Sequence, residues 1–214
     1  SDQQISSFIF SLSGGGYEIY ADGRIIGVPE SPGIFELDVV GDSISIKALE
    51  KPIGVFSVVY FIGSNVQNTF KIKPLLSAKP AKSYNDNLIV SVVNKNFKII
   101  NDVDIENYVA GVVESESGGY ATTEYYKLQS ILCRTYTLSH LRRHEMEGFN
   151  LCDLVHCQAY NSKTIKENII SAVAAVKGLV IVDSELELIT AAYHSNCGGE
   201  TVNSENVWSL PTPY

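Results

Sequence analysis

The stretch NLIVSVVNKNFKIINDVDIENYVAGVV, residues 87–113, changes its hydrophobic period near residue 103. Before that point, two apolar runs flank Asn-Lys-Asn at 94–96, which predicts two strands joined by a tight hairpin. After it, Asp104 is a possible N-cap, and apolar side chains recur at helical spacing at Ile105, Tyr108, Val109 and Val112. We therefore predict an α+β fold, with a β-rich region over residues 1–95 and a mixed helix and strand region over residues 96–214.

The β-rich region carries three further strand signals. FIFSL and YEIYADG flank three glycines and predict a strand followed by a hairpin. GIFELDVVGDSISIKAL, residues 33–49, contains two alternating runs separated by Gly-Asp. GVFSVVYFIG, residues 54–63, predicts one long buried strand, whereas the two prolines in KPLLSAKPAKSYND, residues 73–86, favour a loop.

The second region, residues 96–214, is predicted to be mainly helical. ESESGGY, residues 114–120, is expected to end the first helix. Residues 122–144 form the longest helix candidate, with Thr122 or Thr123 as its cap and one stripe made by Tyr125, Leu128, Leu132 and Tyr136. Residues 164–178 predict another helix, which ends at Gly178, and residues 179–195 predict a hairpin.

Composition excludes several classes of protein. The 214 residues are 45 % hydrophobic and 19 % charged, which is typical of a globular protein. The net charge of −8 and the lack of any basic stretch argue against a nucleic-acid partner. No apolar run reaches the roughly 20 residues of a membrane helix. No signal peptide is recognisable at the first residues, and the absence of an initial Met fits a processed chain.

Two carboxylates, Glu114 and Glu116, lie between the first two predicted helices. A partly buried glutamate at such a junction has a raised pKa, as a general acid near neutral pH requires. The alternative is that both are solvated loop residues. Further along, YHSNCGGET combines His194 with Gly198 and Gly199, whose backbone N–H groups could approach a ligand closely. The alternative there is a tight turn with a core histidine and a buried Cys197.

The four cysteines all lie in the second half of the chain. NLCDLVHCQAY, residues 150–160, places Cys152, His156 and Cys157 close together, with His140 and His144 upstream. Thiolates and imidazoles are zinc ligands, but a disulfide and simple packing explain the cysteines equally well. A nucleophilic pair such as Cys197 with His194 would need a partner from elsewhere, because neighbours in a strand point to opposite faces.

Five blocks in this order resemble one family. They are IENYVAGVVESE, EYYKLQSILCRTY, CDLVHCQAY, AVAAVKGLVI, and YHSNCGGET followed by VWSLPTPY. Together they resemble the stage II sporulation protein D (SpoIID/LytB-type) family over roughly residues 95–214. The resemblance implies bacterial cell-wall remodelling by a lytic transglycosylase, a carbon–oxygen lyase that cuts peptidoglycan glycan strands, preferably after their peptides have been removed.

By this resemblance Glu116 is the single acid/base. It would protonate the oxygen between N-acetylmuramic acid and N-acetylglucosamine, and then assist the muramic C6 hydroxyl in closing a 1,6-anhydro ring. One carboxylate suffices because no water attacks. Glu114 occupies a variable position of the motif. The chain departs from the family pattern at Ser117 and Gly118, where Met and Pro are usual, which implies a more flexible loop there and leaves catalytic competence open.

The same resemblance implies further site residues. Those expected to contact substrate are Arg134, Gln158, Tyr160, His194, Ser195, Gly198 and Gly199. A zinc ion is expected on His144, Cys152 and Cys157 with a fourth position open, and His156 and His140 are alternatives to His144. In an oxidising space, a Cys152–Cys157 disulfide competes with the metal.

The family also implies a place and partners for the chain. We expect an extracytoplasmic protein of the cell envelope whose signal peptide or anchor has been removed, with cell-wall hydrolases as possible partners. Two other functions remain open. One is a non-catalytic glycan-binding or assembly module, and the other is a zinc-dependent hydrolase that uses metal-bound water.

Overall fold

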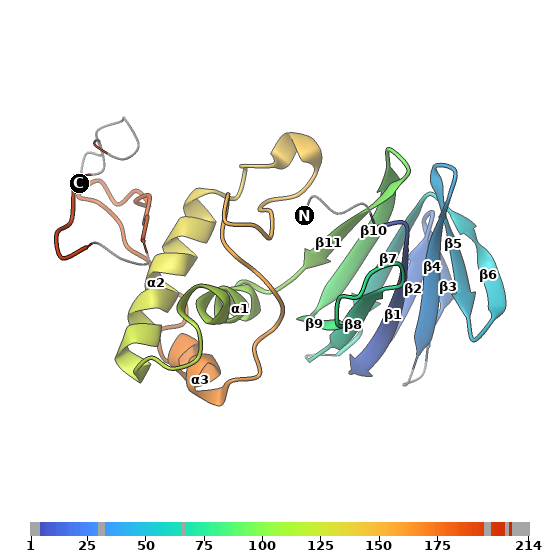
Figure 1. Cartoon of the computed structure of the whole chain (residues 1–214), viewed down its shortest axis with the longest axis horizontal. Coiled ribbons are helices and arrows are strands. Elements are labelled where there is room, and N and C mark those ends of the chain that lie inside the picture. Colours follow the sequence, from blue (N-terminus) through green and yellow to red (C-terminus); the bar gives the residue numbers. More distant parts are fainter. Residues whose placement is uncertain (1–4, 30–32, 66, 195–197, 204–205, 207–214) are drawn as a thin grey trace.

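The computed structural model describes residues 5–29, 33–65, 67–194, 198–203 and 206. Within these residues the strands come first and the helices follow, so the predicted α+β class is confirmed. Figure 1 shows the strands gathered as two facing sheets at one end of the molecule, with the three α-helices beside them.

Two antiparallel sheets form the strand region, and the first has the order β6-β5-β4-β1-β8-β9 among the described residues. Its strands are β1 (Ser7–Gly14), β4 (Ile34–Val40), β5 (Ser43–Ala48), β6 (Lys51–Phe56), β8 (Thr69–Pro74) and β9 (Lys82–Asn85). The second sheet has the order β11-β10-β7-β2-β3. Its strands are β2 (Tyr17–Ala21), β3 (Arg24–Gly27), β7 (Val58–Gly63), β10 (Asn87–Val93) and β11 (Asn96–Asp102).

The core of this sandwich follows from the alternation of side chains along each strand. In β1, every second residue from Phe8 to Leu12 is buried. Phe10 of β1 stacks on Phe61 of β7 with ring centroids 3.9 Å apart, so this contact joins the two sheets. Because aromatic side chains bury large apolar areas, the cluster of phenylalanines contributes much of the stability of the sandwich.

Two of the predicted hairpins are confirmed. β4 pairs with β5, and β10 pairs with β11 from Asn87–Asp102 to Val93–Asn96. The turn between β10 and β11 places Asn94 and Lys95 at φ +51° and +60°, as a tight two-residue hairpin turn requires. β11 therefore extends the second sheet to Asp102, beyond the boundary expected near residue 95.

The hairpin predicted after the first strand is present, because β2 pairs with β3. β1 and β2 lie in different sheets, since the chain crosses from one to the other at the three glycines, where Gly15 has φ +77°. Two other predictions for the strand region are wrong. The single strand expected over residues 54–63 is divided at Ser57 into β6 and β7, which lie in different sheets. The Asp22 carboxylate accepts hydrogen bonds from the N–H groups of Ser57 and Val58 and so supports this break. The predicted loop 73–86 contains the edge strand β9.

Three α-helices and one 3₁₀ turn are described after the sheets. They are α1 (Ile105–Ser117), α2 (Thr123–Ser139), η1 (Glu145–Glu147) and α3 (Glu167–Ala175). Both predicted caps are present, because Asp104 accepts from the Glu106 N–H and Thr122 from the Tyr125 N–H. α1 continues through residues 114–117, where a break was expected, and ends at Gly118 with φ +68°.

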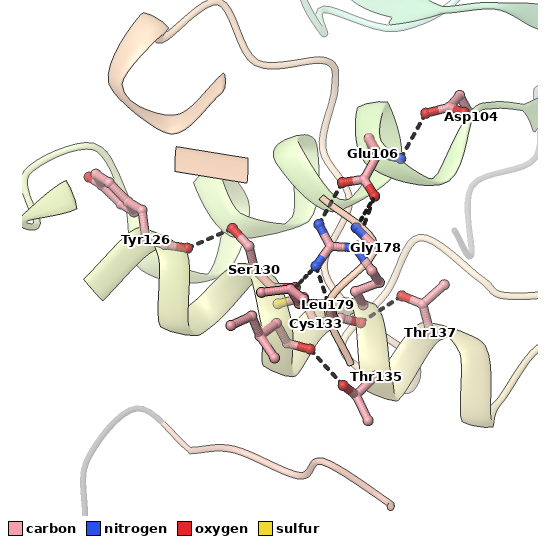
Figure 2. Close-up of polar contacts among 11 residues, drawn as sticks. Asp104, Glu106, Tyr126, Ser130, Cys133, Thr135, Thr137, Gly178 and Leu179 are labelled. Atoms are coloured by element: carbon pink, nitrogen blue, oxygen red, sulfur yellow. Dashed lines mark hydrogen bonds and ion pairs between the residues drawn. The ribbon is translucent and has the colours of Figure 1, made fainter. Parts of the chain in front are cut away.

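The helices enclose a second core, which differs from the first in being partly polar. Val109, Val112 and Val113 of α1 and Ile169 of α3 are buried there. The α2 face turned toward them contains Ser130 and Thr137, each of which donates to a carbonyl one turn earlier (Figure 2). The predicted stripe is not that buried face, since Tyr125 and Leu128 are 44 % and 55 % exposed.

The last part of the described chain is less regular than expected. The hairpin predicted over residues 179–195 is reduced to a single bridge between Val182 and Leu188. Gly178 has φ +73° beyond the end of α3, as a residue following a helix C-terminus often does. Tyr84 of β9 packs against both cores and links the sheets to the helices.

Candidate active site and metal-binding cluster

Glu116 lies on the last turn of α1, and its side chain is exposed. Its Oε1 accepts a hydrogen bond of 2.7 Å from the backbone N–H of Ala159. Because Ala159 is two residues after Cys157, the segment that carries the predicted metal ligands also holds the carboxylate predicted to be catalytic.

The chain after Cys157 runs closely along α1. Ser115 Oγ accepts from the N–H of Asn161 at 3.1 Å and donates to the carbonyl of Gly111 at 2.8 Å. A Cβ at Gly111 would meet the carbonyl oxygen of Ser162 at 2.7 Å and would also clash with the Tyr160 ring. A glycine at position 111 therefore allows the close approach that brings Ala159 within reach of Glu116.

Glu114 has a different environment. Its Oε1 lies 3.1 Å from Nζ of Lys166, and both side chains are about one-third exposed. The two carboxylates predicted as candidates are thus distinguished by their partners, a backbone amide for Glu116 and an ammonium group for Glu114.

A buried thiol and a phenol lie close to Glu116. Burial raises the pKa of Cys133 to about 12, although hydrogen bonds with Tyr193 and Gln129 act in the opposite direction. Burial also raises the pKa of Tyr193, and the negative charge of Glu116 adds to this effect. Both groups therefore stay protonated at neutral pH, and the Cys133 thiol donates to the Tyr193 hydroxyl across 3.7 Å.

The predicted metal ligands are brought together. His144, Cys152, His156 and Cys157 each offer a ligand atom, and these atoms all lie within 4.8 Å of one another. Cys157 Sγ is 3.4 Å from Nε2 of His144 and 3.7 Å from Nδ1 of His156, and Cys152 Sγ is 3.7 Å from the same His156 atom. Tetrahedral zinc with ordinary bond lengths separates a sulfur from a nitrogen by about 3.6 Å. The cluster can therefore hold a metal ion.

The surroundings of this cluster favour ligation. Glu147 lies 2.6 Å from Nδ1 of His144 and raises the pKa of that imidazole. This contact directs Nε2 toward Cys157, and metal-binding histidines commonly have such a carboxylate partner. Burial opposes ionisation of Cys152, but hydrogen bonds from the Leu154 backbone, His156, Cys157 and His144 lower its pKa to about 6. The thiolate that a metal requires is thus stabilised.

Two alternatives for this segment can be compared with the structure. Cys152 and Cys157 are free thiols, and so is Cys133. His140 is not part of the cluster, because its Nδ1 lies 2.8 Å from the carbonyl of Tyr136 and its ring stacks on the Tyr136 ring. Of the two alternatives to His144, His156 thus joins the cluster as a fourth donor.

The residues predicted to contact substrate fall into two groups. Arg134, Gln158 and Tyr160 are at most 6 % exposed and are hydrogen-bonded within the protein. His194, Gly198 and Gly199 are exposed, and both glycines have positive φ. Ser195 lies outside the described residues, as does Cys197.

Some residues around Glu116 were not predicted. Ala159 contributes only its backbone, and no side-chain pattern identifies such a donor. Thr137 and Tyr193 take part through buried hydrogen bonds. Polar residues recur along α2 among apolar neighbours, and this pattern could have indicated a polar buried face that includes Thr137. These residues are Gln129, Ser130, Arg134 and Thr137.

Comparison with known proteins finds one family that is similar to part of the chain. The family model SpoIID, described as stage II sporulation protein, matches residues 93–182, which include α1, α2, the His/Cys cluster and α3. This part of the chain is similar to the SpoIID family. The resemblance inferred from the sequence blocks is thereby confirmed.

Individual relatives agree with this assignment. The chain is 34 % identical over 104 residues to an amidase enhancer of Bacillus subtilis strain 168, covering 49 % of this chain and 14 % of the relative. It is 27 % identical over 163 residues to stage II sporulation protein D of the same strain, covering 66 % and 47 %. An uncharacterized protein of Brachyspira hyodysenteriae strain WA1 is 29 % identical over 133 residues, covering 61 % and 33 %. The chain spans less than half the length of each relative.

None of the helices among the described residues has both the length and the apolar composition that crossing a bilayer requires.

Proposed function

We propose that the chain acts in the bacterial cell wall as a lytic transglycosylase on peptidoglycan glycan strands, with Glu116 as its acid/base. The observation that carries this proposal is the 2.7 Å hydrogen bond from Ala159 to Glu116, which holds an exposed carboxylate at a helix end beside the Cys/His cluster. The similarity of residues 93–182 to the SpoIID family supports the cell-wall role.

The reaction needs only one ionisable group. Protonated Glu116 gives its proton to the glycosidic oxygen between N-acetylmuramic acid and N-acetylglucosamine, so the bond from that oxygen to C1 breaks. The muramic C6 hydroxyl adds to C1, and the Glu116 carboxylate takes the hydroxyl proton. No water is consumed, so no second carboxylate is required. Glu114, paired with Lys166, has no step to perform.

We further propose that the cluster binds one zinc ion through His144, Cys152, His156 and Cys157. Two thiolates and two imidazoles form a closed tetrahedral set, which is typical of structural zinc and leaves no position for a reactive water. The expectation of an open fourth position is replaced by this proposal. Bound zinc would supply a rigid crosslink of the segment that ends at Ala159.

The exposed His194, Gly198 and Gly199 remain the proposed contacts for the glycan, together with Ser195. Their region follows Tyr193, which is hydrogen-bonded to Cys133 near Glu116. An extracytoplasmic location and a cell-wall hydrolase partner belong to the same proposal, and the amidase enhancer among the relatives supports the partner.

That relative also favours a second candidate function, a glycan-binding module that assists a hydrolase without turnover. The two functions, and a zinc-dependent hydrolase, give different products from peptide-stripped glycan strands. Mass spectrometry should find 1,6-anhydro ends with the transglycosylase, reducing ends with a hydrolase and intact strands with a binding module. Reducing ends alone would contradict our proposal.

A further inference from the structure

The side chain of Gln158 is buried beside the candidate site, although the family resemblance implied a substrate contact. It is 1 % exposed and lies between α2 and the segment that carries Tyr193. The next peptide N–H along the chain, that of Ala159, is the one that donates to Glu116. Contacts that hold the Gln158 side chain in place therefore also hold the Ala159 N–H that donates to Glu116.

The amide of Gln158 uses its full hydrogen-bonding capacity within the protein. Its Nε2 donates to the carbonyl of Cys133 at 3.3 Å and to the Tyr193 hydroxyl at 3.4 Å. Its Oε1 accepts from the hydroxyls of Thr137 at 2.8 Å and Tyr108 at 3.4 Å. The single hydroxyl hydrogen of Thr137 is shared between this oxygen and the carbonyl of Cys133, which is also 2.8 Å away. A primary amide has two donor hydrogens and two acceptor lone pairs, so none is left for a ligand.

The four partners come from three separate parts of the chain. Tyr108 belongs to α1, Cys133 and Thr137 belong to α2, and Tyr193 lies beyond α3. A side chain held from three directions in a buried setting has little freedom, and satisfied buried networks of this kind rigidify their surroundings. The peptide between Gln158 and Ala159 is consequently held in one orientation.

We propose that Gln158 is a positioning residue, which orients the Ala159 N–H and through it the carboxylate of Glu116. Thr137 supports it with the shortest of its hydrogen bonds. This inference rests on the proposed role of Glu116. A reacting group displaced by as little as 1 Å can lose about a hundredfold in rate, so a support that lies outside the site can still control turnover.

Thr137→Val is the informative variant, and α2 provides its matched control. Thr135 is also a buried threonine, but its hydroxyl accepts from the N–H of Ile181 and donates to the carbonyl of Ile131 rather than to Gln158. Thr135→Val makes the same chemical change on the same helix at a similar depth. Both variants lose a buried hydroxyl, so a general loss of stability should affect both.

Two measurements on the full chain test the proposal, namely amide hydrogen exchange and steady-state turnover of peptide-stripped glycan. Thr137→Val and Gln158→Met should each raise exchange at Ala159 about tenfold, on the basis of a weakened hydrogen bond. They should lower kcat about tenfold with little change in KM. Thr135→Val should raise exchange at Ile181 instead and leave kcat unchanged.

Hydrogen exchange at the Ala159 N–H can be measured whether or not the chain is catalytically active. If the wild-type chain releases no anhydro products, the proposed function fails, and the exchange data alone decide the positioning role. Unchanged exchange at Ala159 in both Gln158→Met and Thr137→Val would overturn the inference. So would an equal loss of kcat in Thr135→Val and Thr137→Val, because a structural effect would then explain both.

Discussion

The guanidinium of Arg134 meets the carboxylate of Glu106 through two hydrogen bonds, Nε to Oε1 at 3.0 Å and Nη2 to Oε2 at 2.5 Å. The Arg134 side chain is 1 % exposed and also donates to the carbonyl of Leu179, while the N–H of Gly178 donates to Glu106 (Figure 2). One ion pair thus joins α1, α2 and the chain after α3. Arg134, near the end of the block EYYKLQSILCRTY, thus has a structural partner rather than a free charge for a ligand.

Loss of the acidic partner should destabilise the fold strongly. Glu106→Ala leaves the buried guanidinium without a counter-charge, and breaking such a pair costs about 3–5 kcal/mol. Urea denaturation should report this as a lower midpoint. The control is Glu124→Ala, which removes an exposed pair with Lys127 and should cost less than about 1 kcal/mol. Equal midpoints for the two variants would mean that the Arg134 pair does not hold the helices together.

The two neighbouring glutamates of α1 should differ in their effect on activity. Glu116→Gln keeps the shape of the side chain and removes its ionisable group, so turnover of peptide-stripped glycan should fall at least about a hundredfold. Glu114→Gln removes only a partly exposed ion pair with Lys166 and should change turnover less than about twofold. Near wild-type turnover in Glu116→Gln would remove Glu116 from the catalytic role.

The thiol of Cys133 should be inert in the folded protein. Burial raises its pKa to about 12, so the reactive thiolate is scarce at neutral pH and forms only as the pH rises toward that value. Iodoacetamide at pH 8 should therefore leave Cys133 unmodified in the native chain and alkylate it in urea, as peptide mass analysis can show. Rapid alkylation of native Cys133 would indicate that the core around Tyr193 opens readily.

Local sequence signals predicted the elements whose structure depends on near neighbours. Asp104 caps α1 because its side chain reaches the N–H of Glu106, two residues away, and the turn at 94–95 closes its hairpin by backbone conformation alone. The three glycines after β1 also signalled a turn correctly. Which sheet the following strand joins depends on contacts such as Phe10 with Phe61, which are distant in sequence, so local signals did not show that β1 and β2 lie in different sheets.

In the candidate site, too, contacts between residues distant in sequence were harder to predict than local features. The family resemblance implied His144, Cys152 and Cys157 as metal ligands, and the structure brings them together with His156. The buried face of α2 escaped prediction because its polar side chains are satisfied by distant partners. A threonine such as Thr137 counts as polar in a periodicity argument, yet it is buried once Gln158 lies beside it.

His156 and His140 should differ in their effect on zinc binding. His156 contributes Nδ1 to the cluster, whereas His140 is hydrogen-bonded to the Tyr136 carbonyl outside it. We expect one zinc per chain by elemental analysis of protein purified without chelator. Mutation of a residue that only supports a ligand weakens metal binding by up to about a hundredfold, so loss of a ligand in His156→Ala should weaken zinc binding by more than that. His140→Ala should leave zinc binding unchanged.

Glu147 tests how the ligands are oriented. Its carboxylate fixes His144 through Nδ1, so Glu147→Gln should weaken zinc binding about 10–100-fold while the four ligands remain. Affinity should also fall as the pH is lowered, because protons compete with zinc for the two thiolates and the imidazoles. Competition with a fluorescent chelator measures all of these variants on one scale. A chain that contains no zinc, and in which two thiols appear only after reduction, would show that Cys152 and Cys157 form a disulfide and that the segment is held covalently instead.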